Sequence, residues 1–262
     1  MILTNENYYS IEANIEYMSV SQYKDFKTCE AMAMAKLRGE WEEPQTVALL
    51  VGSYVDAWFE GTLDAFKADH PEIFTRAGKL RADFKKADKL IEFMQKDPVF
   101  MEYMAGEKQV IMTAELFGTP WKIKIDSYHP GEKIVDGKVM RSMERIMGKS
   151  FVEHWGYDIQ MAVYSEVVRK VTGMSLETFL APVTKQEPPD KEIIDIPEWR
   201  RKECLDDVER DMPRILAVKS KKIPPERCGM CDYCRKTKMI TGPIDFELVG
   251  LTAAERRAIL GG

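Results

Sequence analysis

The decisive stretch of this sequence runs from Trp121 to Met140 and reads Trp-Lys-Ile-Lys-Ile-Asp-Ser-Tyr-His-Pro-Gly-Glu-Lys-Ile-Val-Asp-Gly-Lys-Val-Met. It predicts two short strands joined by a His-Pro-Gly turn. If the turn centres on Gly131, Asp126 lies opposite Asp136, with about 5 Å between their Cβ atoms. Lys138 shares a face with Asp136, about 7 Å further along the strand. Two carboxylates at that distance repel each other unless a positive charge lies between them, and a divalent cation would supply that charge.

Another strand is predicted just before this hairpin. Residues 109–116 alternate apolar and polar side chains, as a half-buried strand does, and residues 117–120 supply a turn. The three strands in succession predict a meander that carries the acidic site. The last of them, residues 133–139, is apolar enough to lie centrally in a sheet.

A carboxylate also lies within an apolar helical segment. Residues 46–66 predict a buried helix in which Asp56 and Glu60 are four residues apart and share one face. Gly52 lies one turn earlier, where a backbone or a ligand could approach closely. An acid in apolar surroundings needs a partner, so Asp56 is either a capped or solvent-facing carboxylate or a metal ligand.

A second helix with functional polar residues follows the hairpin. Residues 156–168 have apolar side chains at helical spacing, and Gln160 and Tyr164 lie four residues apart on an adjoining face. Three more elements follow: strands at 178–184 and 192–196, and a charged helix from 197 to about 219.

The cysteines predict a metal site. Three of the five form a Cys-x2-Cys-x2-Cys cluster: Cys228, Cys231 and Cys234. Cys29, inside a helix predicted from about residue 19 to 39 with Ser21 as its N-cap, is the natural fourth ligand; His154 and Cys204 are weaker candidates. Structural zinc takes four tetrahedral ligands, commonly as two separated pairs, whereas three close cysteines and a distant one also suit a [4Fe-4S] cluster. The odd number of cysteines and the clustering of three of them favour a metal in a reducing compartment over a disulfide framework.

Bulk composition limits the class of protein. With 262 residues, 45% of them apolar and 10% aromatic, the chain can form a proper core, and we expect a single domain over residues 1–262. The net charge of −5 argues against binding nucleic acid through overall positive charge, although a local basic groove is compatible with it. The N-terminus does not resemble a signal peptide, and no apolar run is long enough to cross a membrane. We therefore expect a soluble cytoplasmic protein.

The basic segment before the strands leaves alternatives open. Residues 79–89 are the most basic part of a charged helical region, and they form either a solvated helix face or a contact surface for DNA phosphates. A last helix is predicted from Thr252, where Glu255 completes a capping box.

Taken in order, these motifs resemble those of the PD-(D/E)xK nuclease superfamily and, within it, of the RecB-like and phage RecE-like exonucleases. The matching residues are Gly52-x3-Asp56-x3-Glu60, Asp126, Asp136-x-Lys138 and Gln160-x3-Tyr164. The early cysteine and the late cysteine cluster resemble those of the iron-sulfur members, among them the CRISPR adaptation nucleases and the AddB-type helicase-nucleases. The match extends from Ser21 to Cys234, and it is specific as a set, whereas each motif alone is weak.

The resemblance implies an α/β fold with a restriction-endonuclease-like core, in which helices flank both sides of a central mixed sheet. It assigns catalytic roles to Asp126, Asp136, Lys138, Gln160 and Tyr164. The residues that it assigns to binding Mg²⁺ or Mn²⁺ are Asp56, Asp126 and Asp136. Lys138 would position or activate the attacking water, and the helix residues would orient the site and its DNA. The cysteines that would hold a [4Fe-4S] cluster, or Zn²⁺ instead, as a staple between the chain ends are Cys29, Cys228, Cys231 and Cys234.

The sequence departs from the family pattern at three positions. Asp56 stands where the family usually has histidine, which replaces an imidazole by an oxygen ligand compatible with Mg²⁺ or Mn²⁺. Gly137 stands where an apolar residue is usual, and glycine weakens a strand interior or marks a close backbone approach. Ile125 stands where the superfamily name has a proline that takes no part in the chemistry.

The implied activity is exonucleolytic hydrolysis of phosphodiester bonds at the ends of linear duplex DNA, in phage or prophage recombination. A single-strand annealing protein is the implied partner, and related exonucleases form ring-shaped oligomers around DNA. The rival hypothesis is a catalytically impaired DNA-binding or scaffolding member of the same fold, which Gly137 favours. A zinc-finger-like regulator is disfavoured because the cysteine cluster ends a large domain instead of forming a small one.

Overall fold

The computed structural model describes residues 1–262 except 241, 252–254, 256–258 and 260–262. The chain forms two compact units from segments that are separate in the sequence. The sheet unit comprises Pro44–Ala114 and Lys122–Asp206. The terminal unit comprises Met1–Glu43, Glu115–Trp121 and Asp207–Gly262. None of the described helices combines the length and apolar character that crossing a bilayer requires.

Four strands form a mixed sheet in the sheet unit. In spatial order they are β3 (Ser127–His129), β4 (Lys133–Met140), β5 (Glu177–Thr184) and β6 (Ile194–Asp195). β4 pairs antiparallel with β3 and parallel with β5, and β6 pairs antiparallel with β5. The predicted interior position of β4 and the predicted mixed α/β fold are therefore confirmed.

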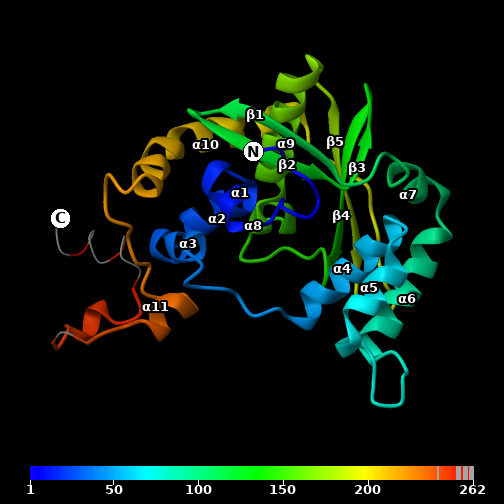
Figure 1. The fold of residues 1–262 in the computed structure, drawn as a ribbon, viewed down its shortest axis with the longest axis horizontal. Helices are drawn as coiled ribbons and strands as arrows, with labels where there is room; N and C mark the ends of the chain where they lie inside the picture. The colour runs from blue at the N-terminus through cyan, green and yellow to red at the C-terminus, as the bar shows by residue number, and fades with distance from the viewer. Residues whose placement is uncertain (241, 252–254, 256–258, 260–262) are drawn as a thin grey trace. The chain divides into compact units, whose positions relative to one another are not determined.

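Two helices pack against one face of this sheet, as Figure 1 shows: α4 (Val47–Phe59) and α6 (Ala82–Gln95). Tyr54 of α4 and Ile91 of α6 share one buried core with Val135 of β4 and Ala181 of β5. The unit also contains α5 (Leu63–Asp69), η1 (Pro71–Ile73), α7 (Pro98–Tyr103) and α8 (Phe151–Trp155).

Helix α9 (Tyr157–Thr172) connects β4 to β5 and contacts β5. Successive side chains of a strand point to opposite faces, so Asp136 lies on the other face of β4 from Val135. Gln160 of α9 bonds to Asp136, which places α9 on that second face. Helices therefore cover both faces of the central strand.

The terminal unit is mainly helical. Its own elements are α1 (Ile11–Glu16), α2 (Val20–Thr28), α3 (Glu30–Leu37), α11 (Asp232–Lys236) and η2 (Phe246–Leu248). Three elements contribute residues to both units: β1 (Val110–Leu116), β2 (Thr119–Ile125) and α10 (Glu198–Lys219). The predicted helices at 156–168 and 197–219 and the strand at 178–184 are confirmed.

The N-terminal helix predicted from about 19 to 39 is two helices, α2 and α3, that meet at Cys29. Cys29 is extended, with φ −166° and ψ 108°. The N-cap of α2 is Ser19 instead of Ser21, and its side chain accepts a hydrogen bond from the Gln22 amide at 3.3 Å. No glycine or proline marks the break in the sequence.

Two other predictions need correction. The helix predicted over 46–66 ends at Phe59, because Gly61 takes a positive φ of 73° before α5 begins. The predicted three-strand meander is divided, since β1 and β2 form a sheet of their own and the chain bends at Asp126 before β3. Thr252, the predicted start of a last helix, lies outside the described residues.

Candidate functional site

The two sheet carboxylates face each other across a hairpin. Asp126 occupies the bend between β2 and β3. The β3–β4 register pairs Ser127 with Val135, so its continuation by one residue sets Asp126 opposite Asp136. Asp136 lies in the interior of β4 and is only 2% exposed. A buried carboxylate of this kind requires polar partners.

Asp136 is held through both of its oxygens. Gln160 Nε2 of α9 donates a hydrogen bond to Asp136 Oδ1 at 2.6 Å. Lys138 Nζ, two residues along the same strand, forms an ion pair with Asp136 Oδ2. Three of the residues selected from the sequence are therefore brought together in one contact network.

Asp126 is held by a backbone amide and a side-chain amide. The N–H of Gly137 donates to Asp126 Oδ2 at 3.1 Å, and Gln109 Nε2 donates to Asp126 Oδ1 at 3.4 Å. A Cβ atom at position 137 would lie 3.1 Å from Met104 Cε and 4.0 Å from Asp126 Oδ2. Glycine at this position leaves room for Met104 while its backbone orients the carboxylate.

Asp56 of α4 belongs to the same electrostatic group. Its side chain keeps solvent access, yet protein atoms surround it closely enough that burial raises its pKa to about 7. The positive charge of Lys138 opposes this rise, whereas the negative charges of Asp136 and Glu60 add to it. Burial also raises the pKa of Asp126 well above its ordinary value, with further contributions from Asp136 and Asp56. The carboxylates thus repel one another.

This donor set fits a divalent cation. Mutual repulsion of three carboxylates in partly buried surroundings is relieved when a cation binds between them. Carboxylate oxygens are hard ligands of the kind that Mg²⁺ and Mn²⁺ prefer. The residues that could hold such an ion are Asp56, Asp126 and Asp136.

Lys138 is the cation already present in this network. Burial alone would lower its pKa, but the carboxylates of Asp136 and Asp126 outweigh burial and raise the pKa above the ordinary value. Its Nζ also lies 5.2 Å from the centre of the Tyr157 ring, a cation–π contact. The amine is therefore held as an ammonium group beside the carboxylates.

Tyr164 lies one turn beyond Gln160 on α9, and its side chain is buried. Sequence reasoning missed two neighbours of the site, Gln109 and Tyr157. Tyr157 precedes Gln160 by three residues, and this helical spacing could have identified it. Gln109 has a positive φ of 52° just before β1, and nothing in the sequence signals that conformation.

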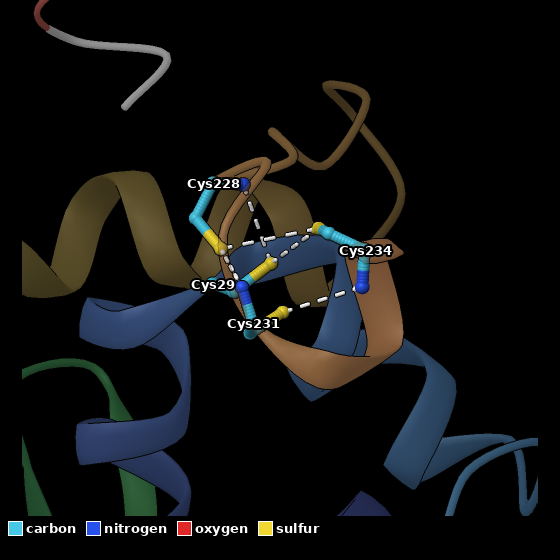
Figure 2. Close-up of side chains that lie close together, drawn as sticks. All are labelled: Cys29, Cys228, Cys231 and Cys234. Atoms are coloured by element: carbon cyan, nitrogen blue, oxygen red, sulfur yellow. Dashed lines mark hydrogen bonds between the residues drawn. The ribbon is translucent and has the colours of Figure 1, made fainter. Parts of the chain in front are cut away.

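A second site lies in the terminal unit, where four cysteines meet (Figure 2). Cys29 comes from the junction of α2 and α3. Cys228 precedes α11, Cys231 is the N-cap of that helix and Cys234 lies within it. The Sγ atoms of Cys29 and Cys234 are 3.6 Å apart, those of Cys228 and Cys234 are 3.9 Å apart, and all four lie within 4.8 Å of one another. This group could hold a metal, and it does not include His154 or Cys204.

Backbone amides point at the sulfur atoms of this cluster. Although burial raises the pKa of Cys228, hydrogen bonds from the N–H groups of Cys231 and Met230 outweigh burial and lower the pKa to about 7. Burial raises the pKa of Cys231 to about 12. Because burial keeps the Cys231 thiol protonated at neutral pH, a bound cation would be required to ionise it.

Comparison with known proteins adds the following findings. The family model of the PDDEXK-like domain of unknown function (DUF3799) matches residues 19–237. A crystal structure from Eubacterium rectale, named "Putative exonuclease", is 52% identical, covers 95% of this chain and 99% of its own, and has a TM-score of 0.92. The crystal structure of SSO0001 is 13% identical, covers 86% of this chain and 95% of its own, and has a TM-score of 0.32, too low to support a conclusion. No protein of curated function matches the sequence.

Proposed function

Because the chain belongs to the family of the PDDEXK-like domain of unknown function, DUF3799, we propose that it is a metal-dependent nuclease that degrades linear duplex DNA from its ends. The observation that carries this proposal is the group of mutually repelling carboxylates Asp56, Asp126 and Asp136, with Lys138 paired to Asp136, the least exposed of them. The name of the Eubacterium rectale relative supports the exonucleolytic mode.

Mg²⁺ or Mn²⁺ is the proposed cofactor, held by Asp126 and Asp136, with Asp56 as a further ligand. When bound, such an ion polarises the scissile phosphate and lowers the pKa of a bound water molecule from 15.7 towards neutrality. The carboxylate that replaces the family's usual histidine at position 56 suits a hard cation.

The remaining residues position these ligands and compensate charge. Lys138 places an ammonium group beside Asp136, where it can stabilise negative charge that develops on a phosphate. Gln160 fixes one oxygen of Asp136, and the Gly137 amide fixes one oxygen of Asp126. Gly137 thereby has a constructive role in the site, which weakens the rival hypothesis of an impaired, purely DNA-binding protein. Tyr164 is proposed to help orient the site and its DNA.

The biological setting that we propose is resection of duplex ends in phage or prophage recombination, in the cytoplasm, together with a single-strand annealing protein. This part of the proposal is supported by the resemblance of the motif series to the phage RecE-like exonucleases. The resemblance also supports an oligomeric assembly around DNA.

The decisive experiment compares wild-type protein with Asp136→Asn on end-labelled linear duplex DNA and on closed circular DNA, with Mg²⁺, Mn²⁺ or a chelator. We expect the wild type to degrade linear DNA alone, and only with metal. Asn keeps the shape of Asp136 but removes its charge, so the variant should lose the activity. Asp64→Asn, at an exposed position in the first turn of α5, is the matched control and should remain active.

Undiminished cleavage by Asp136→Asn would contradict the assignment of the site. Cleavage of closed circular DNA at the same rate as linear DNA would contradict the exonucleolytic mode but would still support nuclease activity. Metal-independent DNA binding without any cleavage by the wild type would favour the scaffolding hypothesis instead.

A further inference from the structure

The spacing of the four cysteines identifies the kind of metal centre that they can hold. Ligands of one tetrahedral ion with metal–sulfur bonds of about 2.3 Å lie about 3.8 Å from one another. The Sγ atom of Cys234 lies 3.6 Å from that of Cys29 and 3.9 Å from that of Cys228, and these distances bracket this value. The whole set of Sγ atoms spans no more than 4.8 Å. The geometry is that of four ligands around one ion.

A [4Fe-4S] cluster needs a larger cage. In such a cluster each thiolate binds a different iron, and the irons and sulfides occupy the space between the four thiolates. Thiolates that share one tetrahedral ion lie about 3.8 Å apart, whereas thiolates on separate irons are held farther apart by the irons and sulfides between them. The four sulfur atoms shown in Figure 2 enclose no space for four irons and four sulfides.

The backbone around the cysteines is arranged to support thiolates. Cys228 Sγ accepts N–H hydrogen bonds from Met230 at 3.4 Å and from Cys231 at 3.3 Å. Cys231 Sγ accepts one from Cys234 at 3.4 Å, and Cys29 Sγ accepts one from Cys228 at 3.5 Å. Such contacts fix ligand orientation and reduce the negative charge on sulfur, as the surroundings of structural metal sites do.

Apolar side chains close the site. Ala31 and Met32 of α3 are buried against Cys29 and Cys234, and Trp41 and Tyr233 pack at the edge with ring centres 5.6 Å apart. Four protein ligands leave no coordination position for water or substrate, and this distinguishes a structural from a catalytic ion.

We infer that Cys29, Cys228, Cys231 and Cys234 bind one zinc ion as a closed structural site that joins the start of α3 to α11. This centre differs from the iron-sulfur cluster that the family resemblance implies. Thiolate ligands in tetrahedral geometry suit zinc. The ion would connect two segments that are distant in the sequence, because Cys228 follows Cys29 by 199 residues. The inference concerns a second site and does not rest on nuclease activity.

The test is metal analysis of protein purified without oxygen from cells supplied with both iron and zinc. We expect about one zinc per chain and no acid-labile sulfide. Protein refolded with Co²⁺ should show sulfur-to-cobalt charge-transfer absorption and the strong visible bands of tetrahedral cobalt. Iron together with sulfide would overturn the inference, as would one iron without sulfide or the absence of any stoichiometric metal.

Variants assign the ion to these residues. Cys29→Ser should lose most of the zinc, whereas Cys204→Ala, which removes the fifth cysteine from its buried position on α10, should retain it. Asp136→Asn should also retain the zinc, which separates the cysteine site from the carboxylate site. Full zinc retention by Cys29→Ser would contradict the four-cysteine assignment, and zinc loss in Asp136→Asn would move the ion to the carboxylates. The wild-type metal content decides the question even if Cys29→Ser fails to fold.

Discussion

The carboxylate site and the cysteine site are assembled in opposite ways. Asp126 and Asp136 come from one hairpin whose strand pairing sets them opposite each other. The cysteine site depends on Cys29 meeting a cluster that begins 199 residues later in the chain. The hairpin site is thus shaped by backbone geometry before any ion binds, whereas in the proposed zinc site the ion holds the distant cysteines together. Loss of charge should damage the first, and loss of the ion should unfold the second.

The largest effect is expected from Cys231→Ser. A structural ion contributes folding free energy directly, so this variant should lose about 4 kcal/mol or more of unfolding free energy. Urea titration followed by circular dichroism measures the loss, with Cys204→Ala as the control. If Cys231→Ser is as stable as the wild type, the cysteine site does not depend on an ion for its stability, and the contrast with the hairpin site is wrong.

Asp126→Asn should leave stability nearly unchanged and lower metal-dependent DNA cleavage by about 100-fold or more, equivalent to about 2.7 kcal/mol. The reason is that Asn keeps the hydrogen-bonding shape of the side chain but supplies no negative charge to a cation. Initial rates on end-labelled linear DNA measure the effect. An unchanged rate would mean that Asp126 is a structural partner of the Gly137 amide and not a metal ligand.

Gln160→Ala should have an intermediate effect. The substitution removes the 2.6 Å hydrogen bond to Asp136 Oδ1, and loss of a partner that orients a metal ligand typically costs about 10-fold to 100-fold in activity or metal affinity. Cleavage rates measured across a range of Mg²⁺ concentrations should show the greatest loss at low Mg²⁺, with half-maximal activity shifted to a higher Mg²⁺ concentration. Gln160→Glu serves as a comparison, because it adds a negative charge beside Asp136 and should be worse than alanine. A wild-type Mg²⁺ profile for Gln160→Ala would remove Gln160 from the site.

The smallest effect is expected from Gly137→Ala. The amide that bonds to Asp126 is retained, and the added Cβ lies 3.1 Å from the flexible end of Met104, which can move by a few tenths of an ångström. We expect a loss of at most about 1.5 kcal/mol in unfolding free energy and a few-fold change in activity. The double variant Gly137→Ala, Met104→Ala should recover the activity. Complete inactivation that this double variant does not relieve would mean that the backbone at position 137 has another function.

The sequence predicted the parts of the structure that depend on local pattern. The strands β4 and β5 and the helices α9 and α10 were predicted correctly. The apolar run of β4 indicated a central strand, and the spacing of apolar residues in α9 indicated a helix. The opposition of Asp126 and Asp136 followed from a turn centred on Gly131, which the register bears out.

The contacts that were not predicted depend on tertiary structure. The break at Cys29 has no glycine or proline to mark it, and the Cys29 sulfur contacts Cys234, which lies 205 residues later in the chain. The division of the meander at Asp126 reflects a bend that strand propensity does not encode. The contact between Gly137 and Met104 joins residues far apart in the chain, so only the fold could show why glycine fits there.

The terminal unit is built from segments that lie before and after the sheet unit in the sequence, so it can be completed only after the sheet unit has been synthesised. Residues 1–43 are synthesised before the sheet unit, but their partners in Asp207–Gly262 are synthesised after it. At typical synthesis rates, residues 44–206 take about 10 to 30 s to produce. Throughout that time the other three cysteines of the site have not been synthesised, so Cys29 cannot contact them. The sheet unit, in contrast, is available in full before the terminal unit can close. A nascent chain therefore carries a complete carboxylate site before it carries a complete cysteine site.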